Sequence, residues 1–404
     1  MAEASVSPVQ AAGRRTAPLW FVLGLMSSVT FVGILSELVP SGILPQMTEG
    51  LGVSESRIGM LVGVYALASA VFTIPLISAT LAVNRKHLLL ALLAGFAVSN
   101  VVVGLSSSYP VILAARVAGG ICAGVMWPMI AAYGTRLVPP EQHGRAITVI
   151  MAGTTLGISL GLPAMTLLGA TLGWRTEFVV LGLVAALIAT LSHRYLPAVG
   201  GERLSRGNSP LTLLGNPAIL IVLLLTLLAV AAHYGVYTYI TLLVKTVDLA
   251  GGVAAALLIF GAGSVIAVVL SARWIDAHLR TLIITMLVLG GISMVLLLAF
   301  ARTAGVAHLA FFLWGLSYGP LGSAFQAAIV RQVHSGKDVA TSLQSCMFNL
   351  SIMLATWAGG VLLVRLPEGG MKGVVYLSLG CFALAAALAL LARRTLRVKV
   401  AGAE

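Results

Sequence analysis

Residues 87–133 read HLLLALLAGFAVSNVVVGLSSSYPVILAARVAGGICAGVMWPMIAAY. Two apolar runs meet there at a short polar break, Ser106 to Ser108. Each run has the roughly 20 residues that an α-helix needs to cross a bilayer core about 30 Å thick. Neither run shows the two-residue alternation of barrel strands. The stretch therefore predicts two consecutive membrane-spanning helices.

The same pattern extends along the whole chain. Hydrophobic residues make up 59% of the 404 residues and charged residues 9%, whereas about a quarter of an ordinary globular chain is charged. We predict an all-α membrane protein with 12 transmembrane helices, in the apolar runs 18–43, 57–80, 87–106, 109–133, 144–169, 176–196, 216–242, 250–271, 280–301, 306–330, 339–364 and 372–392. The first run is longer than the apolar region of a signal peptide, so we expect it to be retained.

Lys and Arg are distributed unevenly between the two sides of the predicted membrane. Of the 24 such residues, seven lie within a span or on the side away from the termini: Arg57, Arg116, Arg175, Lys245, Arg302, Arg365 and Lys372. The others share the side of both termini, and positively charged loops tend to stay in the cytoplasm. We therefore predict cytoplasmic termini. This topology accounts for the net charge of +12 without a nucleic-acid partner.

Residues 197–215 form the longest break between predicted spans and are rich in Gly, Pro, Ser and Arg. We predict a cytoplasmic linker there, between two six-helix bundles at 18–196 and 216–392, with cytoplasmic tails at 1–17 and 393–404. A weak repeat supports the division, because SATLAVNRKHLLL at 78–90 and SARWIDAHLRTLI at 271–283 lie 193 residues apart. Two facing halves with a midplane site between them are typical of secondary transporters.

Two charged residues, Glu37 and Arg116, fall clearly inside predicted spans. A charge near the bilayer centre costs a few kcal/mol, so such side chains usually face a cavity or a partner. Both lie about seven residues, or roughly 10 Å, from the side away from the termini. We predict that they face each other, directly or through water, and that Glu37 carries a transported proton. A static ion pair that joins two helices is the structural alternative.

Aromatic residues mark candidate ligand contacts. Trp127 shares a helical stripe with Arg116 and is either a stacking platform or a packing residue. His233, Tyr234 and Tyr237 gather in the run at 216–242. For His233 the alternatives are a neutral histidine with its hydrogen bonds satisfied between helices and a second proton site, since its unperturbed pKa is about 6.5.

The second half adds polar candidates for the same cavity. Tyr318 and Gln326 lie in the run at 306–330, and Asn349 lies on a polar stripe of the run at 339–364. Their hydroxyl and amide groups suit ligand contact, although Asn349 could equally bond a neighbouring helix.

The run at 144–169 contains GTTLGISLGLP, which places Gly153, Gly157 and Gly161 four residues apart before Pro163. Glycines at this spacing form a groove for close helix contact, and the proline frees a carbonyl near residue 159 and permits a kink. We predict a gating role for this helix; simple helix packing is the common alternative.

Several classes of function are excluded or disfavoured by what the sequence lacks. It contains no G-x-x-x-x-G-K-[ST] loop, no H-E-x-x-H and no G-x-S-x-G, which argues against an ATPase and a membrane hydrolase. The three cysteines have no metal-ligand spacing. We therefore expect neither an enzyme nor a metal site.

At these residues the chain resembles a major facilitator superfamily transporter, in the twelve-helix drug/proton antiporter branch that includes bacterial sugar-efflux and arabinose-efflux permeases. SELVPSGILPQMTEGLGVSESRIGMLVGVYAL, from residue 36, resembles the first helix pair, with Glu37 as its carboxylate. ARVAGGICAG carries Arg116 and Gly120, and GTTLGISLGLP with GWRTEF resembles the fifth helix and the loop after it. The resemblance implies alternating access, with proton entry driving export.

Two departures from that family pattern concern the loops expected to gate the transporter. The loop after the second helix reads LAVNRKH, with Val83 in the usual place of an Asp, whereas ARWIDAHLR after the eighth helix keeps Asp276. We assign gating roles to Arg85, Asp276 and Arg280 in these loops. The fifth helix also lacks the full Gly-Pro-x-x-Gly-Gly ending.

The sequence therefore predicts a monomeric, multi-pass exporter of small organic molecules in the bacterial inner membrane, driven by the proton motive force without a cofactor. Its partners would be the substrate, protons and the lipid bilayer. Neutral or mildly amphipathic substrates fit best, such as sugar-like compounds or neutral drugs, because no second acid is available to hold a dication. Proton-coupled uptake and a non-transporting membrane sensor are the alternatives.

The gating assignment yields a first test. We expect Asp276→Asn to impair transport more than Val83→Ala, because the second half keeps the acid that the first half lacks. Transport rates of the two variants in the same vesicles measure this difference, and equal, negligible effects would refute the assignment.

Overall fold

The computed structural model describes residues 17–53, 55–203, 205, 209–300, 303, 305–366, 369–393 and 395–396. The predicted tails at 1–17 and 393–404 lie almost wholly outside these residues. The described residues are helical and contain no strand, which confirms the all-α prediction. In the first half the helices are α1 Leu19–Gly42, α2 Leu44–Leu51, α3 Glu55–Ala79, α4 Arg85–Leu105, α5 Tyr109–Thr135, η1 Pro140–Gln142, α6 His143–Leu156, η2 Gly157–Gly161, α7 Leu162–Leu172 and α8 Trp174–Tyr195.

The second half follows a short helix in the predicted linker. Its helices are α9 Pro210–Leu214, α10 Pro217–Tyr237, α11 Ile240–Thr246, α12 Gly252–Ala299, α13 Val306–Tyr318, α14 Leu321–Val330, α15 Lys337–Arg365 and α16 Gly370–Leu391. Local side chains fix two of the starts, since the Asn84 side chain accepts from the N–H of Lys86 and the Asn216 side chain from that of Ala218. Such N-caps satisfy helix donors that have no partner within the helix.

Among the described residues, ten helices are long and apolar enough to cross a membrane. One of them, α12, has 48 residues and a non-helical residue, His278, where two helices join. A straight helix of that length would measure about 70 Å, more than twice the bilayer core. The predicted run at 306–330 is broken into α13 and α14 at Gly319 and Pro320. The protein is thus a multi-pass membrane protein.

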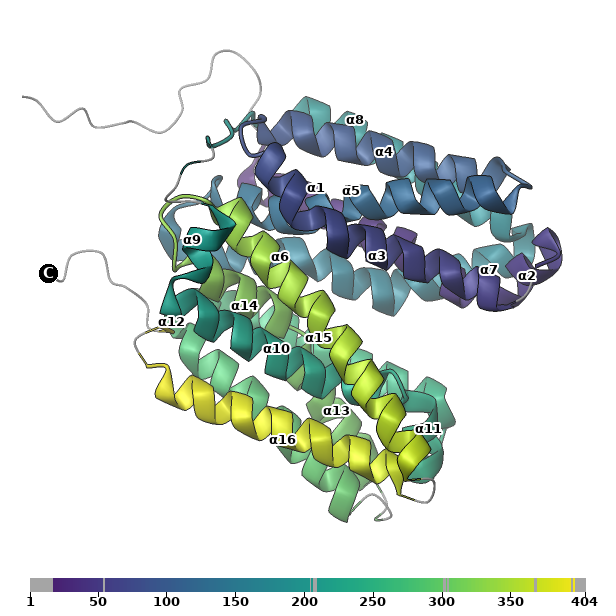
Figure 1. The fold of residues 1–404 in the computed structure, drawn as a ribbon, viewed down its shortest axis with the longest axis vertical. Helices are drawn as coiled ribbons and strands as arrows, with labels where there is room; N and C mark the ends of the chain where they lie inside the picture. Colours follow the sequence, from purple (N-terminus) through teal and green to yellow (C-terminus); the bar gives the residue numbers. More distant parts are fainter. Residues whose placement is uncertain are drawn as a thin grey trace, which may run out of the picture.

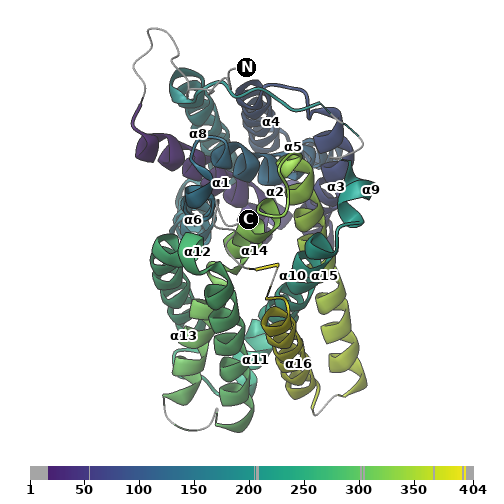
Figure 2. The same cartoon turned by 90° about the vertical axis from the view of Figure 1, so that its left-hand side faces the viewer.

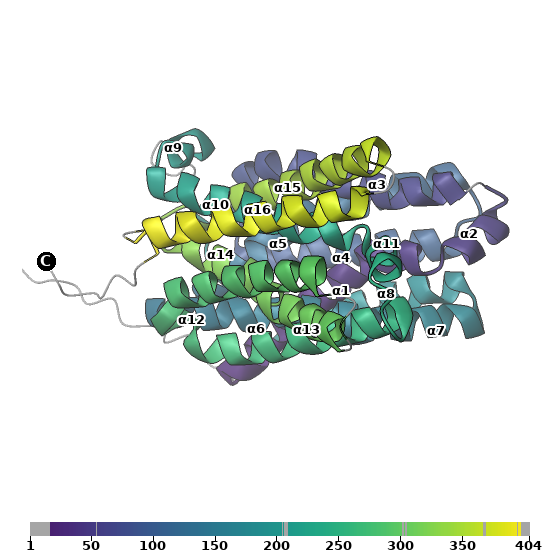
Figure 3. The ribbon, with the colours of Figure 1, turned by 90° about the horizontal axis from the view of Figure 1, so that it is seen from below.

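The helices gather in two groups that diverge from one end of the molecule, with α1 to α8 in one and α10 to α16 in the other (Figure 1). We call the end that carries α9 the linker side and the opposite end the far side; Figure 3 shows α9 at one end and α2 and α7 at the other. The groups touch through α3, α5 and α6 of the first and α12, α14 and α15 of the second. Seen from the linker side, these helices lie where the two groups meet (Figure 2).

The glycine stripe brings α6 against α1. A Cβ at Gly153 would collide with the backbone oxygen of Ser27, and one at Gly161 would press on Phe31 and Leu35 of α1. Residues Gly157–Gly161 form a π-helical turn, η2, directly before Pro163. The sequence therefore predicted the close helix contact and the irregularity correctly, and π-turns of this kind often occur at functional sites.

We expect Gly153→Ala to lower the stability of the first half by about 1–3 kcal/mol, because the added methyl group forces α6 away from α1. Gly63→Ala is the matched control: a Cβ there meets no atom within 4 Å. Thermal unfolding of the purified proteins in detergent measures both. An unchanged Tm for Gly153→Ala would show that the contact is looser than described.

Candidate functional site

Arg116 of α5 is buried, with 1% of its surface exposed. Its guanidinium donates to three backbone carbonyls: Nε to Leu61 at 3.2 Å, Nη1 to Ser36 at 2.5 Å and Nη2 to Glu37 at 3.0 Å. It also lies over the ring of Tyr65, 4.3 Å from the centroid. One side chain thus joins α5 to both α1 and α3.

A proline explains why α1 needs this donor. Pro40 lies inside α1 and has no N–H to give to the carbonyl four residues earlier, which is that of Ser36. An unpaired carbonyl within a bilayer costs several kcal/mol. Arg116 supplies the missing hydrogen bond. Thr73 of α3 does the same for a carbonyl of α5. Pro128 cannot donate to the carbonyl of Gly124, four residues earlier, and the Thr73 hydroxyl donates to that carbonyl instead.

The carboxyl group of Glu37 lies near a second side chain of α5. Glu37 is half-buried, and the indole of Trp127 is close enough to act on its carboxylate. Arg116 acts on the carboxylate through its charge, although the ion pairs of the described residues join other groups. Glu37, Arg116 and Trp127 are therefore neighbours, and the guanidinium donates to the main chain of Glu37 rather than forming the direct pair with its carboxylate that the sequence offered as one possibility.

The second half contributes an aromatic cluster around His233 of α10. The imidazole stacks on Tyr318 at 3.4 Å between centroids, on Tyr237 at 4.9 Å and on Phe260 at 5.6 Å. Trp314 closes the cluster at 5.3 Å. His233 is 2% exposed, and its Nδ1 has no hydrogen-bond partner. The imidazole is thus enclosed between helices without the hydrogen bond at Nδ1 that a satisfied histidine would make, and it takes part in none of the ion pairs among the described residues.

Tyr234 connects this cluster to the first half. Its ring packs edge-on against that of Tyr318 at 6.0 Å, and the Glu37 carboxylate is close enough to act on its hydroxyl electrostatically. The ring also packs on Phe348 of α15 at 6.0 Å. The acid of α1 therefore acts across to Tyr234 of α10 in the other half, and Tyr234, Tyr237 and Tyr318 are all half-buried.

Gln326 and Asn349 lie apart from these contacts. Gln326 of α14 is 8% exposed, and its Oε1 has no partner. Asn349 of α15 is half-buried and donates from Nδ2 to the carbonyl of Ser345, one turn earlier. In the described residues neither forms a hydrogen bond or ring contact with the tyrosines.

A group of charges, which we call the linker-side ion cluster, joins the halves. Asp338 at the start of α15 is completely buried, lies 3.4 Å from Arg85 and contacts Arg136. Arg136 also pairs with Glu202 of the linker at 2.9 Å. Glu202 accepts in addition from the N–H of Gly336, just before α15. First half, linker and second half therefore meet at one set of charges.

Asp276 of α12 makes a second charged contact between the two halves, with the start of α6. Its carboxylate accepts from the N–H groups of Gly144 and Arg145, at 2.7 and 2.9 Å, and from Arg331 at 3.2 Å. A carboxylate at the start of α6 complements the helix dipole. In the first half Val83 is 40% exposed, and the acid at the interface is Asp338, contributed by α15 itself. Arg280 instead reaches α16 of its own half, where it donates to the carbonyl of Leu390.

Sequence reasoning missed Asp338, Glu202 and Tyr65. Asp338 could have been found as an acid in the first turn of an apolar run, two residues after a glycine. Glu202 carried a weaker signal, as the single acid of the linker. Nothing in the sequence marked Tyr65. Its ring lies against the Arg116 guanidinium, and this contact depends on which face of α3 meets Arg116.

Residues 26–356 match the family model of the Major Facilitator Superfamily. A probable sugar efflux transporter of Mannheimia succiniciproducens is 27% identical over 336 residues, which cover 82% of this chain and 84% of that protein. The chain therefore belongs to the Major Facilitator Superfamily, a family of transporters and not of enzymes.

Solved structures show the same fold at low sequence identity. The human organic anion transporter MFSD10 aligns with a TM-score of 0.73 and 18% identity, covering 92% of this chain and 98% of its own. The fucose:proton symporter FucP of E. coli aligns with a TM-score of 0.74 and 13% identity, covering 93% and 99%.

We expect Asp338→Asn to destabilise the protein by about 3–5 kcal/mol, because it leaves the buried Arg85 without its acidic partner. The Tm of the purified protein measures this loss. Glu141→Gln, at an exposed acid near the same side, is the control and should leave the Tm unchanged. If the double variant Arg85→Gln/Asp338→Asn is as unstable as the sum of its single changes, the two side chains are not coupled.

Proposed function

We propose that the protein is a proton-coupled exporter of small, neutral or mildly amphipathic organic molecules, with sugar-like compounds as the leading class. The observation that carries the proposal is the half-buried Glu37 carboxyl, which lies beside Arg116 and within electrostatic reach of Tyr234 in the other half. The similarity to a probable sugar efflux transporter over 82% of the chain supports the substrate class and the direction.

The same proposal includes the arrangement in the membrane. If α12 crosses twice, with its turn at His278, and α13 and α14 cross once together, the chain has twelve crossings in two bundles, 18–196 and 216–392. The excess of Lys and Arg on the side of the termini supports a cytoplasmic location for that side, in a bacterial inner membrane. We propose that one chain suffices for transport.

Protonation of Glu37 would change the charge balance of the site. Because three carbonyls hold the Arg116 guanidinium in place, the cation stays while the carboxylate gains or loses its charge. A change of one charge in a medium of low dielectric constant shifts the balance between conformations by kcal/mol amounts. A proton bound from the far side and released toward the linker side would thereby drive the exchange of substrate in the opposite direction.

The side chains near Glu37 favour a neutral substrate. Tyr234, Tyr237 and Tyr318 offer hydroxyl groups and ring faces, which suit ligands with both polar and apolar surfaces. Trp127 adds an indole beside the carboxyl group. Such a lining can hold a sugar ring or an uncharged drug without a second acid.

The linker-side ion cluster and Asp276 hold the two halves together at the linker side. The two groups of helices diverge toward the far side (Figure 1). We propose that this arrangement is the outward-facing state, and that Gly153, Gly157, Gly161 and Pro163 allow α6 and α7 to bend as the linker side opens.

We expect Glu37→Gln to abolish transport driven by a pH gradient while substrate exchange without a gradient persists, because glutamine keeps the shape and loses the titratable group. Export from an efflux-deficient host and uptake into inverted vesicles, over a panel of sugars and neutral drugs, measure both activities. Glu49→Gln, at an exposed acid of α2, is the control. Gradient-driven transport at the wild-type rate in Glu37→Gln would end the proposal, and accumulation by whole cells would favour uptake over export.

A further inference from the structure

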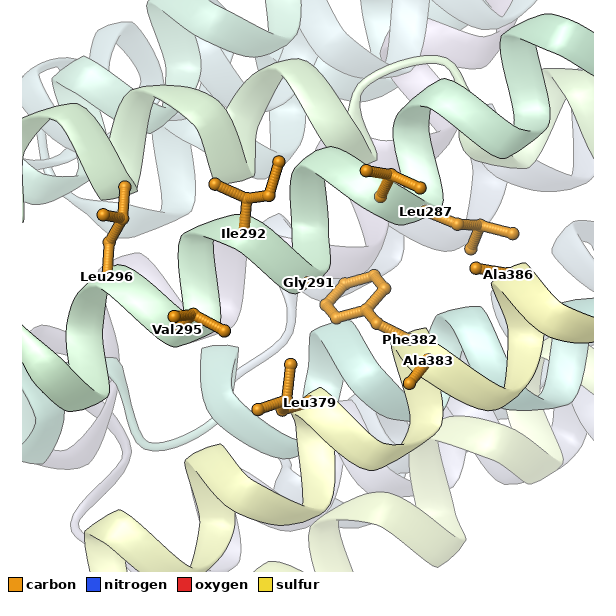
Figure 4. Close-up of a pocket in the computed structure, with 10 residues that line it drawn as sticks. Leu287, Gly291, Ile292, Val295, Leu296, Leu379, Phe382, Ala383 and Ala386 are labelled. Atoms are coloured by element: carbon orange, nitrogen blue, oxygen red, sulfur yellow. The ribbon is translucent and has the colours of Figure 1, made fainter.

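An apolar groove runs along the outside of the second half, between α12 and α16. It has a volume of about 330 Å³. Leu287, Gly291 and Ile292 line it from α12, and Phe382 and Ala386 from α16. Figure 4 shows these side chains converging on the groove, and every stick drawn there is carbon. The groove therefore offers no hydrogen bond to an occupant.

The groove opens toward the surroundings of the protein. Phe382 forms its floor and is completely buried, whereas Val288, Ile292 and Val295 on the rim are 42–44% exposed. Figure 1 places α16 on the side of the second half that faces away from the first. In a multi-pass membrane protein, such a face borders lipid and not the region around Glu37.

A cation lies at the linker-side end of this groove. Arg280 precedes Leu287 by seven residues, about 10 Å along the helix. Its Nη2 donates to the carbonyl of Leu390 at 3.0 Å, one turn beyond Ala386. The guanidinium thus bridges α12 and α16 where the groove ends, and the exposed Arg393 follows at the same end of α16.

The guanidinium of Arg280 is incompletely satisfied. Its Nε is buried and has no acceptor. Asp276, one turn earlier, is engaged by Arg331 and by the start of α6, and none of the ion pairs among the described residues includes Arg280. The site therefore combines an apolar groove with a cation, Arg280, that has no carboxylate partner among the described residues.

We propose that this groove and Arg280 bind one anionic phospholipid of the linker-side leaflet. An acyl chain would fill the groove, and the phosphate would accept hydrogen bonds from the guanidinium, a pairing with favourable fork geometry. Anionic lipids are attracted to Arg near the membrane surface by about 1 kcal/mol for each cation, or about fivefold in affinity. The site is separate from the transport site and does not depend on the proposed substrate.

Two variants separate the two parts of the site. Arg280→Gln removes the cation and keeps the groove. Gly291→Leu fills the groove and keeps the cation; a Cβ at Gly291 meets its nearest atoms at 3.9 Å, so the backbone can accept the change. Arg273→Gln is the control, because Arg273 is an exposed cation on α12 that the groove does not include.

Native mass spectrometry of the delipidated full-length protein, titrated with phosphatidylglycerol or phosphatidylcholine, measures the binding. We expect the wild type and Arg273→Gln to bind one phosphatidylglycerol about fivefold more tightly than phosphatidylcholine. Arg280→Gln should lose that preference and still bind phosphatidylcholine, which also shows that it is folded. Gly291→Leu should bind both lipids more weakly while its Tm stays at the wild-type value.

Three results would overturn the proposal. The first is wild-type affinity for phosphatidylglycerol in Arg280→Gln, and the second is wild-type affinity for both lipids in Gly291→Leu. The third is an equal loss of preference in Arg273→Gln and Arg280→Gln, which would mean that any cation on this side has the same effect.

Discussion

The hydrogen bonds from the Arg116 guanidinium to the carbonyls of Ser36, Glu37 and Leu61 determine the organisation of the first half. Pro40 leaves one of these carbonyls without its helical donor, and a bilayer provides no water to replace it. Burying the Arg116 cation in the membrane costs free energy, and these hydrogen bonds offset that cost while they link α5 to α1 and α3. Glu37 is attached to this fixed charge through its own backbone, so its carboxyl group can change protonation without displacing the cation.

The linker side shows how the two halves use charge differently. In the second half Asp276 reaches across to the start of α6. In the first half Arg85 and Arg136 reach across to Asp338 at the start of α15. Both arrangements place an acid at the N-terminus of a helix, where the helix dipole favours it. The Val83 departure in the first half is therefore compensated by an acid on the opposite helix, and Glu202 ties the linker to the same contact.

Length and hydropathy were enough to predict the helices, because a span in lipid must satisfy its backbone locally. The approach of Glu37 and Arg116 was also predictable, since an intramembrane charge needs a partner and helical spacing gives its depth. The atoms that Arg116 contacts were not, because they depend on the rotation of α1 and α3 about their axes. The aromatic cluster around His233 likewise arises from tertiary packing that local sequence does not encode, whereas the kink at His278 falls in the break predicted between the runs 250–271 and 280–301.

The central claim is that Glu37 gains and loses a proton during transport while Arg116 stays in place. Infrared difference spectroscopy of the reconstituted protein between high and low pH tests it most directly, because a protonated carboxyl group has a C=O stretching band separate from that of the carboxylate. The account predicts a component of this band in the wild type that is missing in Glu37→Gln and still present in Glu49→Gln, which loses only the component of an exposed acid. A band of equal size in Glu37→Gln would contradict it.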